Sequence, residues 1–431
     1  MNLFSSLANA FRVPDLRKKI LFTAFIIAVY RLGSHIPTPG IDVQAAQQFS
    51  QGIQGGVFQF INLFSGGALT QMAIFALGIM PYITSSIIMQ LLTVVIPKLE
   101  AWSKEGETGT KKITQWTRYL TVLLAIMQST GLAFLFHSGG ITTTNGQPVD
   151  LIPQWSGFRV FLIVMSLTAG TALIMWMGEL ITQRGIGNGM SILIFASIVS
   201  TLPYEGKAIL DQKGPFSFAV ICAMGLGIIL SIVFMEQGQR RIPVQYAKRV
   251  VGRRMYGGSS TYIPLKVNQA GVIPIIFAAS VLYIPTLLQN VVHNDAIQTF
   301  ISDHLVNSRS WLYMLIYGTL VVFFTYFYTA ITFNPVDVAD NMKKYGGFIP
   351  GIRPGRQTAE YLDRILTRIT LPGALYIALI ALLPSIFVAT QNISALPFGG
   401  TSILITVGVT LETMKQIESQ LMMRHYEGFL K

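Results

Sequence analysis

Long apolar runs follow one another along this 431-residue chain, separated by short polar connections. A helix needs roughly 20 mostly apolar residues to cross a bilayer, so each long run predicts one membrane span. The runs predict ten spans, at residues 20–36, 72–96, 117–137, 157–178, 186–203, 216–235, 270–289, 310–333, 370–390 and 400–418. A shorter apolar piece runs from Val57 to Phe64. It is too short to cross a bilayer, so we expect it to fold back into the membrane or to lie against the protein.

The composition excludes an ordinary soluble protein. Hydrophobic residues make up 52% of the chain and charged residues only 12%, whereas about 25% of a soluble domain is charged. The single cysteine, Cys222, excludes an intrachain disulfide, and the five histidines are scattered without metal-ligand spacing. A basic run at 17–19 precedes the first span, and no convincing small-residue cleavage site follows it. We therefore expect a retained signal anchor.

The net charge of +12 is concentrated in alternate connections. The connections on the side of both termini carry 26 of the 31 lysines and arginines, and the opposite side carries three, Lys207, Lys213 and Arg309. Lysine and arginine collect on the cytoplasmic side of membrane proteins. The bias therefore predicts that both termini lie in the cytoplasm.

The expected fold class is an all-α polytopic membrane protein whose ten helices form two halves of five. We place the halves at residues 1–205 and 206–431. An odd number of spans in each half means that two similar halves insert with opposite topology, as in inverted-repeat transporters and channels. No strong repeat of residues joins the halves, so topology alone leaves this arrangement open.

The middles of the predicted spans contain no Asp, Glu, Lys, Arg or His. Ion-coupled transporters place ionisable groups there, so this pattern argues against ion coupling. The sequence also has no HExxH zinc motif, no membrane-embedded aspartate pair and no GxxxxGK[ST] nucleotide loop. We therefore expect neither an enzyme nor a cofactor, and any energy must come from a partner.

Two long basic loops separate later spans, at 236–269 and 334–369. In the first, paired arginines alternate with Val and Tyr before Gly257-Gly258, a pattern typical of a β-hairpin finger. In the second, Pro350-Gly351 and Pro354-Gly355 bracket Arg353 in a rigid, turn-rich segment. Such charges can serve topology or anionic lipid alone. Structured loops of this length favour a docking surface for a large acidic partner instead, such as ribosomal RNA.

Five segments along the chain form a recognisable pattern. They are FALGIMPYITSSIIMQLL (75–92), GIGNGMSILIFASIV (185–199), AGVIPIIFAAS (270–280), NPVDVADNMKKYGGFIPGIRPG (334–355) and FGGTSILI (398–405). These segments resemble the SecY family, the central channel subunits of the bacterial protein translocase. The resemblance runs the whole length of the chain at the same spacing. It implies a channel that moves unfolded polypeptides across the bacterial plasma membrane and releases hydrophobic segments sideways into lipid.

The resemblance also implies roles for individual residues. The family's pore ring corresponds to Ile79, Ile83, Met190, Ile194, Ile276 and Ile405. Its plug corresponds to about 57–67, including Phe58, Phe60, Ile61, Asn62, Leu63 and Phe64. Its lateral gate places Thr84, Ile87, Gln90, Val281 and Ile284 near a seam between spans. Its ribosome and motor contacts correspond to Lys248, Arg249, Arg253, Arg254 and Arg353.

The partners that the resemblance implies are the SecE and SecG subunits, the SecA ATPase motor, the ribosome, membrane lipid and an unfolded polypeptide with a signal sequence. Two other classes of protein remain open at this point. A secondary transporter for a neutral or lipid-like solute needs a polar site at mid-membrane, which the spans largely lack. A structural scaffold for other membrane subunits would not need a plug-like piece.

Overall fold

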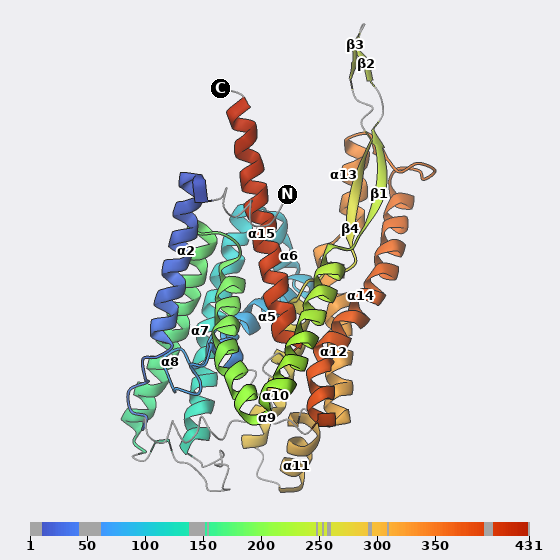
Figure 1. The fold of residues 1–431 in the computed structure, drawn as a ribbon. Helices are drawn as coiled ribbons and strands as arrows, with labels where there is room; N and C mark the ends of the chain where they lie inside the picture. The colour runs from blue at the N-terminus through green and yellow to red at the C-terminus, as the bar shows by residue number, and fades with distance from the viewer. Residues whose placement is uncertain are drawn as a thin grey trace.

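The computed structural model describes residues 11–42, 62–137, 151–152, 155–246, 249–251, 254–256, 260–291, 295–307, 310–391 and 400–429. Within these ranges the chain is mostly helical (Figure 1). The helices in the first half are α2 (Pro14–Gly33), α5 (Met80–Val95), α6 (Pro97–Lys104), α7 (Glu107–His137), α8 (Gly157–Arg184) and α9 (Gly189–Gln237), the last of which runs into the second half. Those that follow are α10 (Ile273–Val291), α11 (Asp295–Phe300), a π-helix (Ile301–Val306), α12 (Trp311–Thr332), α13 (Pro335–Lys344), α14 (Arg356–Gln391) and α15 (Gly400–Phe429).

Every apolar run that predicts a span falls on one of these helices, with two differences in detail. The runs 186–203 and 216–235 share α9, which breaks at Gly214, where φ is +79°. The run beginning at residue 72 becomes helical only at Met80. Residues 66–79 form successive turns instead, because Gly66, Gly67 and Gly78 take positive φ angles that interrupt a helix.

Four helical segments in the described ranges are long and apolar enough to cross a membrane by length and composition. They are Gly157–Arg184, Gly214–Gln237, Trp311–Lys344 and Arg356–Leu383. A fifth joins them if α5 and α6, which are bent by 101°, count as one span. Helices α2 and α5 do not meet these criteria of length and composition. Helix α2 carries basic residues in its first turns, and α5 is only 16 residues long.

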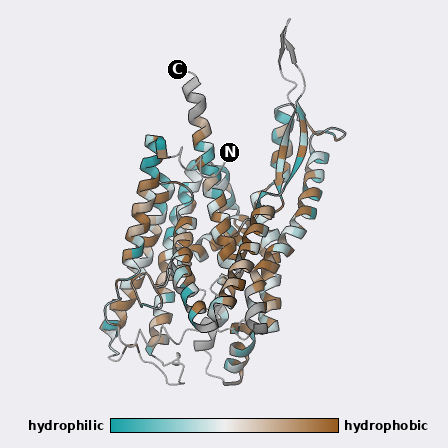
Figure 2. Ribbon diagram, in the orientation of Figure 1, coloured by the Kyte–Doolittle hydropathy of each residue, from teal (hydrophilic) through white to brown (hydrophobic). Residues whose placement is uncertain are grey.

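One large hydrophobic cluster holds the bundle together. It joins side chains from α2, α5, α8, α9, α10, α12, α14 and α15 with Leu63 and Phe64 from the segment before α5. Large apolar side chains also cover the outside of the bundle: Phe161 is 60% exposed, Phe216 81% and Phe234 79%. In Figure 2, apolar segments dominate the middle of the bundle. An apolar outer surface of this extent suits lipid rather than water.

A β-hairpin finger projects beyond one end of the bundle (Figure 1). Strand β1 (Gln239–Tyr246) pairs antiparallel with β4 (Ser260–Lys266), and β2 (Arg249–Val251) pairs with β3 (Arg254–Tyr256) nearer the tip. The predicted hairpin is thereby confirmed. Along β1, Ile242 and Val244 are buried while their neighbours are exposed, which is the period-two pattern of a strand with one covered face.

The second basic loop completes the finger. Its short strand β5 (Gly347–Phe348) pairs with the outer end of β1, giving a sheet in the order β4-β1-β5. Met342, Ile349 and Leu362, all from the second loop, share a hydrophobic core with Ile242 and Val244. The two basic loops therefore form one folded unit with its own core.

Candidate functional site

The six predicted ring residues all lie in the central cluster of the bundle. They come from four places in the chain, namely the start of α5, the start of α9, α10 and α15. Their exposed fractions are 1% for Ile79, 8% for Ile83, 9% for Met190, 4% for Ile194, 7% for Ile276 and 0% for Ile405. Elements far apart in sequence thus bring six buried aliphatic or thioether side chains into one apolar cluster.

Local sequence fixes where two of the helices near these side chains begin. Gly78, with φ +56°, ends the turns before α5, and Pro81 lies in the first turn of that helix. At α9, the side-chain oxygen of Asn188 caps the helix by accepting from the backbone N–H groups of Met190 (3.1 Å) and Ser191 (3.4 Å). Both ring pairs therefore stand at helix starts that the sequence defines.

The tip of the Met190 side chain lies against a neighbouring helix. Its thioether sulfur rests against Gly178 of α8, where a Cβ would come within 2.5 Å of the sulfur. The flexible side chain fills the groove that a glycine leaves. The end of Met190 therefore occupies the α8 side of the cluster.

The predicted plug is described in part. Phe58, Phe60 and Ile61 lie outside the described residues. Residues 62–65 form a helical turn, in which Leu63 (8% exposed) and Phe64 (0%) join the same cluster as the ring. The Asn62 side-chain oxygen accepts from the Thr70 N–H at 3.2 Å, so this turn is tied to the segment that follows it.

Contacts that the sequence did not indicate fasten this turn to the bundle. The Tyr30 hydroxyl donates to the Ser65 carbonyl at 3.2 Å and lies 2.6 Å from the Ser197 hydroxyl. Arg31 donates to the Gly66 carbonyl at 2.7 Å. A charge at the end of a predicted span was the one available signal, because an arginine there needs a partner.

The predicted gate residues lie on α5 and α10, which contact each other. Ile87 is buried in the central cluster, whereas Val281 is 37% exposed. The Thr84 hydroxyl donates to the Met80 carbonyl of its own helix at 3.0 Å, and Gln90 is partly exposed. The backbone of Ile284 lies on α10, and its side chain is outside the description. The predicted gate residues therefore range from buried, at Ile87, to partly exposed, at Gln90 and Val281.

The predicted docking residues lie on the finger unit. Arg249 and Arg254 belong to the β2–β3 hairpin, and Lys248 and Arg253 lie outside the described residues. Arg353 is exposed and forms no ion pair within the part of the chain that the structure describes. Its carbonyl accepts from the hydroxyl of buried Thr358 at 2.9 Å, so the backbone is held while the side chain faces outward.

The basic residues around α6 and α7 are arranged differently. Ion pairs join Lys104 to Glu100 (2.7 Å), Lys111 to Glu107 (2.8 Å), Lys112 to Glu105 (2.9 Å) and Arg118 to Glu179 (2.6 Å). The hydrogen bond from Lys111 holds the pKa of Glu107 below its usual value. These cations are largely balanced by carboxylates of the same chain, and Arg353 on the finger unit is not.

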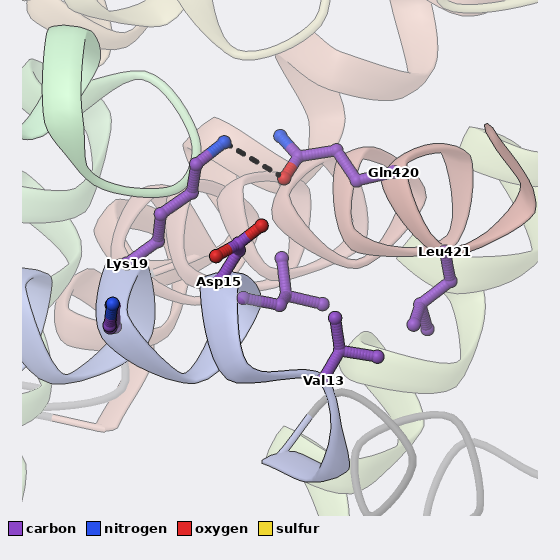
Figure 3. A pocket seen from close by; sticks show the side chains of 7 residues that line it. Val13, Asp15, Lys19, Gln420 and Leu421 are labelled. Atoms are coloured by element: carbon purple, nitrogen blue, oxygen red, sulfur yellow. Dashed lines mark hydrogen bonds between the residues drawn. The ribbon is translucent and has the colours of Figure 1, made fainter. Parts of the chain in front are cut away.

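A shallow pocket of about 320 Å³ lies where α2 begins and α15 nears its end (Figure 3). Val13, Asp15 and Leu421 line it, and Lys19 donates across it to Gln420 at 3.4 Å. None of the predicted ring, plug or gate residues lines this pocket. The described residues also contain no group of three or more His, Cys, Asp or Glu side chains placed to hold a metal ion.

Comparison with known proteins decides the family. The SecY family model matches residues 73–414. The chain belongs to the SecY family. Curated SecY-family relatives named protein translocase subunit SecY are 58% identical in Streptomyces galbus and 54% identical in Mycobacterium tuberculosis, with 100% of both chains covered in each case. The resemblance seen in the sequence is confirmed.

Solved structures show that the fold is shared as well. "The structure of a protein conducting channel" superposes with a TM-score of 0.65 at 16% identity, covering 94% of this chain and 92% of that one. Sec61 in the canine ribosome–channel complex from the endoplasmic reticulum superposes with a TM-score of 0.62 at 16% identity, over the same shares. The mostly helical architecture is therefore the SecY-family fold.

Proposed function

We propose that this chain is the channel subunit of a bacterial protein translocase, which moves unfolded polypeptides across the plasma membrane and releases hydrophobic segments into lipid. The observation that carries the proposal is that the side chains at the six predicted ring positions, from four separate parts of a SecY-family chain, are buried in one apolar cluster. Full-length likeness to translocase subunits supports the same function. Such a subunit is a passive channel and no enzyme.

The membrane arrangement that we propose has ten spans in two inverted halves, 1–205 and 206–431, with cytoplasmic termini. Helices at every predicted span support it. The start of α2 and the end of α15 pack together through Leu16 and Ile417, and both lie at the finger end of the bundle (Figure 1). The excess of basic residues on that side gives the cytoplasmic assignment.

The ring acts as a seal that does not select among side chains. A polypeptide carries every kind of residue, so a pore lined by polar or charged groups would bind some of them too tightly. Aliphatic side chains offer no hydrogen bonds, and a narrow apolar constriction excludes water and ions by dewetting. In this proposal the plug, including Leu63 and Phe64, closes the pore beside the ring when no substrate is present.

Lateral release requires a seam that can part. The contact between α5 and α10 supports this role, with Thr84, Ile87, Gln90, Val281 and Ile284 along it. A hydrophobic signal sequence that reaches the seam moves into lipid with a gain of about 25 cal/mol per Å² of apolar surface transferred. Polar segments gain nothing there and continue through the pore.

Energy comes from a partner docked on the finger unit. We assign Lys248, Arg249, Arg253, Arg254 and Arg353 to contacts with the SecA motor or the ribosome. The canine Sec61 neighbour is part of a ribosome–channel complex, and the exposure of Arg353 without an ion pair among the described residues supports a contact of this kind. SecE and SecG are the further subunits that we expect in the assembly.

Import into reconstituted vesicles tests the proposal. The chain is reconstituted with its expected partner subunits, and SecA, ATP and a secretory precursor are added. We expect the precursor to become resistant to external protease, and the same vesicles without this chain give the baseline. Vesicles that exchange a neutral solute while the precursor stays protease-sensitive would favour a transporter instead.

A further inference from the structure

The base of the proposed plug carries backbone carbonyl groups that point toward α2. Residues 62–65 form a helical turn, and the last carbonyls of any helix lack helical donors. Tyr30 donates to the Ser65 carbonyl at 3.2 Å, and Arg31 donates to the Gly66 carbonyl at 2.7 Å. A cation at the C-terminal end of a helical turn also matches the direction of its dipole.

The contact extends to α9 through Ser197. The hydroxyls of Tyr30 and Ser197 are 2.6 Å apart, and Tyr30, Ser65 and Ser197 are all fully buried. The Ser197 hydroxyl also lies 2.9 Å from the Leu193 carbonyl of its own helix, so its single proton goes either there or to Tyr30. With that proton directed to Tyr30, the Tyr30 proton is directed to the Ser65 carbonyl, and one chain of hydrogen bonds joins α9, α2 and the plug base. With it directed to Leu193, the Tyr30 proton joins α2 to Ser197 or to Ser65. Buried polar groups that lose their partners are costly, so this chain opposes separation of the three parts.

The backbone at this point is shaped for close approach. Gly66 has φ +66°, and a Cβ there would lie 3.0 Å from the Arg31 guanidinium and 3.1 Å from the Ser197 Cα. Only glycine combines that φ with that contact at low cost. The Tyr30 ring stacks on Phe75 with centroids 5.7 Å apart, which fixes the direction of its hydroxyl.

We propose that Tyr30, Arg31 and Ser197 form a latch that holds the plug base against α2 and α9 and sets how often the plug leaves the pore. The inference rests on the proposed function, because it takes Leu63 and Phe64 as part of the plug. The three are positioning residues, since they act through the plug and touch no substrate. Loss of a latch bond shifts the population toward the displaced plug.

The test measures plug exposure in the full translocase. A reporter cysteine is introduced by Leu63→Cys, after the exposed Cys222 is removed by Cys222→Ser. Labelling by a membrane-impermeant maleimide is followed in Tyr30→Phe and Arg31→Gln variants. Loss of one hydrogen bond is expected to raise the labelling rate roughly 2- to 10-fold. Resting ion conductance in planar bilayers is expected to rise with it.

Tyr376→Phe is the matched control. It removes a similar hydrogen bond, from Tyr376 of α14 to Ser231 of α9 at 2.9 Å, which involves neither the latch residues nor the plug base. We expect it to leave labelling unchanged. Arg31 is half-buried, so Arg31→Gln tests the latch even if Tyr30→Phe does not fold.

Insertion of a stalled precursor distinguishes failure of the latch from failure of the plug assignment on which the latch rests. Labelling that rises with precursor but is the same in the latch variants and in the parent would overturn the latch and leave the plug. Labelling that does not rise with precursor would overturn the plug, and the latch with it. A rise in Tyr30→Phe or Arg31→Gln but not in Tyr376→Phe supports both.

Discussion

At the scale of single residues, the proposed seal consists of buried apolar side chains that line the pore as well as pack the interior. Ile79, directly before α5, and Ile276 on α10 share one cluster with Leu63 and Phe64 of the proposed plug. A seal of this kind works because water gains no hydrogen bonds inside it. A single amide at that level supplies such bonds and allows a water column to form.

Substituting Ile79 and Ile276 by Asn is therefore expected to wet the constriction. We predict a rise in resting ion conductance in planar bilayers and a relaxed requirement for a strong signal sequence. The double Ile→Val variant is the control, because it keeps the ring apolar and changes its volume little. Conductance in the Asn variant equal to that in the Val variant would remove these residues from the ring.

Arg353→Glu is expected to stop motor-driven translocation while leaving insertion and folding intact. The reason is that Arg353 is exposed on a backbone held by Thr358 and has no ion pair among the described residues. Protease protection of a precursor in vesicles measures the effect. Arg356→Glu is the neighbouring control, since Arg356 pairs with Glu360 at 2.9 Å. Normal transport by Arg353→Glu would contradict its role.

At the scale of elements, the alternation of residue types and the turn residues predicted the finger. Two other features, strand β5 and the late start of α5, could not be predicted from such patterns. Strand β5 is two residues long, Gly347–Phe348, and carries no period that a sequence can reveal. Its pairing with β1 depends on the fold that brings both loops together. The late start of α5 depends on the positive φ of Gly78, which hydrophobicity does not report.

Charge reversal at Arg253 and Arg254 is expected to weaken ribosome binding and to flatten its salt dependence. Each lost phosphate contact lowers the slope of log K against log[salt] by about 0.7–0.9. Binding titrations at several salt concentrations measure the slope. Reversal of Lys104 and Lys111 is the control, because glutamates on their own helical segments already pair with them. An equal slope for both variants would assign the finger arginines to topology or lipid.

Arg118→Met is expected to loosen the contact between α7 and α8. Arg118 holds both oxygens of Glu179 at 2.7 and 2.6 Å, and the Glu179 side chain is only 16% exposed. Leaving that carboxylate without its partner costs about 1–3 kcal/mol of stability. Thermal unfolding in detergent measures the loss, with Lys104→Met, at an exposed pair, as the control. Equal melting temperatures would contradict this estimate.

At the scale of the whole molecule, the sequence predicted the class and the family because both are spread along the chain. Apolar runs mark the helices, and matching segments at matching spacing mark the family. Side-chain direction was harder to predict. The spacing of Met190 and Ile194 puts both on one face of α9, yet the Met190 tip turns to Gly178, because a glycine on another helix leaves room for it.

The same limit applies to the base of the proposed plug. Tyr30 and Ser197 lie in ordinary apolar surroundings in the sequence, 167 residues apart, and only the fold brings their hydroxyls together. Long-range polar contacts of this kind leave no local pattern. Arg31 alone gave a hint, as a charge at the end of a span.

The central claim is that a translocating polypeptide passes through the buried ring. Site-specific crosslinking of a stalled secretory precursor tests it most directly, with photoreactive groups in turn at Ile79, Ile83, Ile194, Ile276 and Ile405 and with exposed Phe161 and Phe234 as outer controls. We predict crosslinks at all five ring positions and none at the two outer ones. Crosslinks confined to the outer positions, or absent from the ring while the precursor is stalled in the membrane, would contradict it.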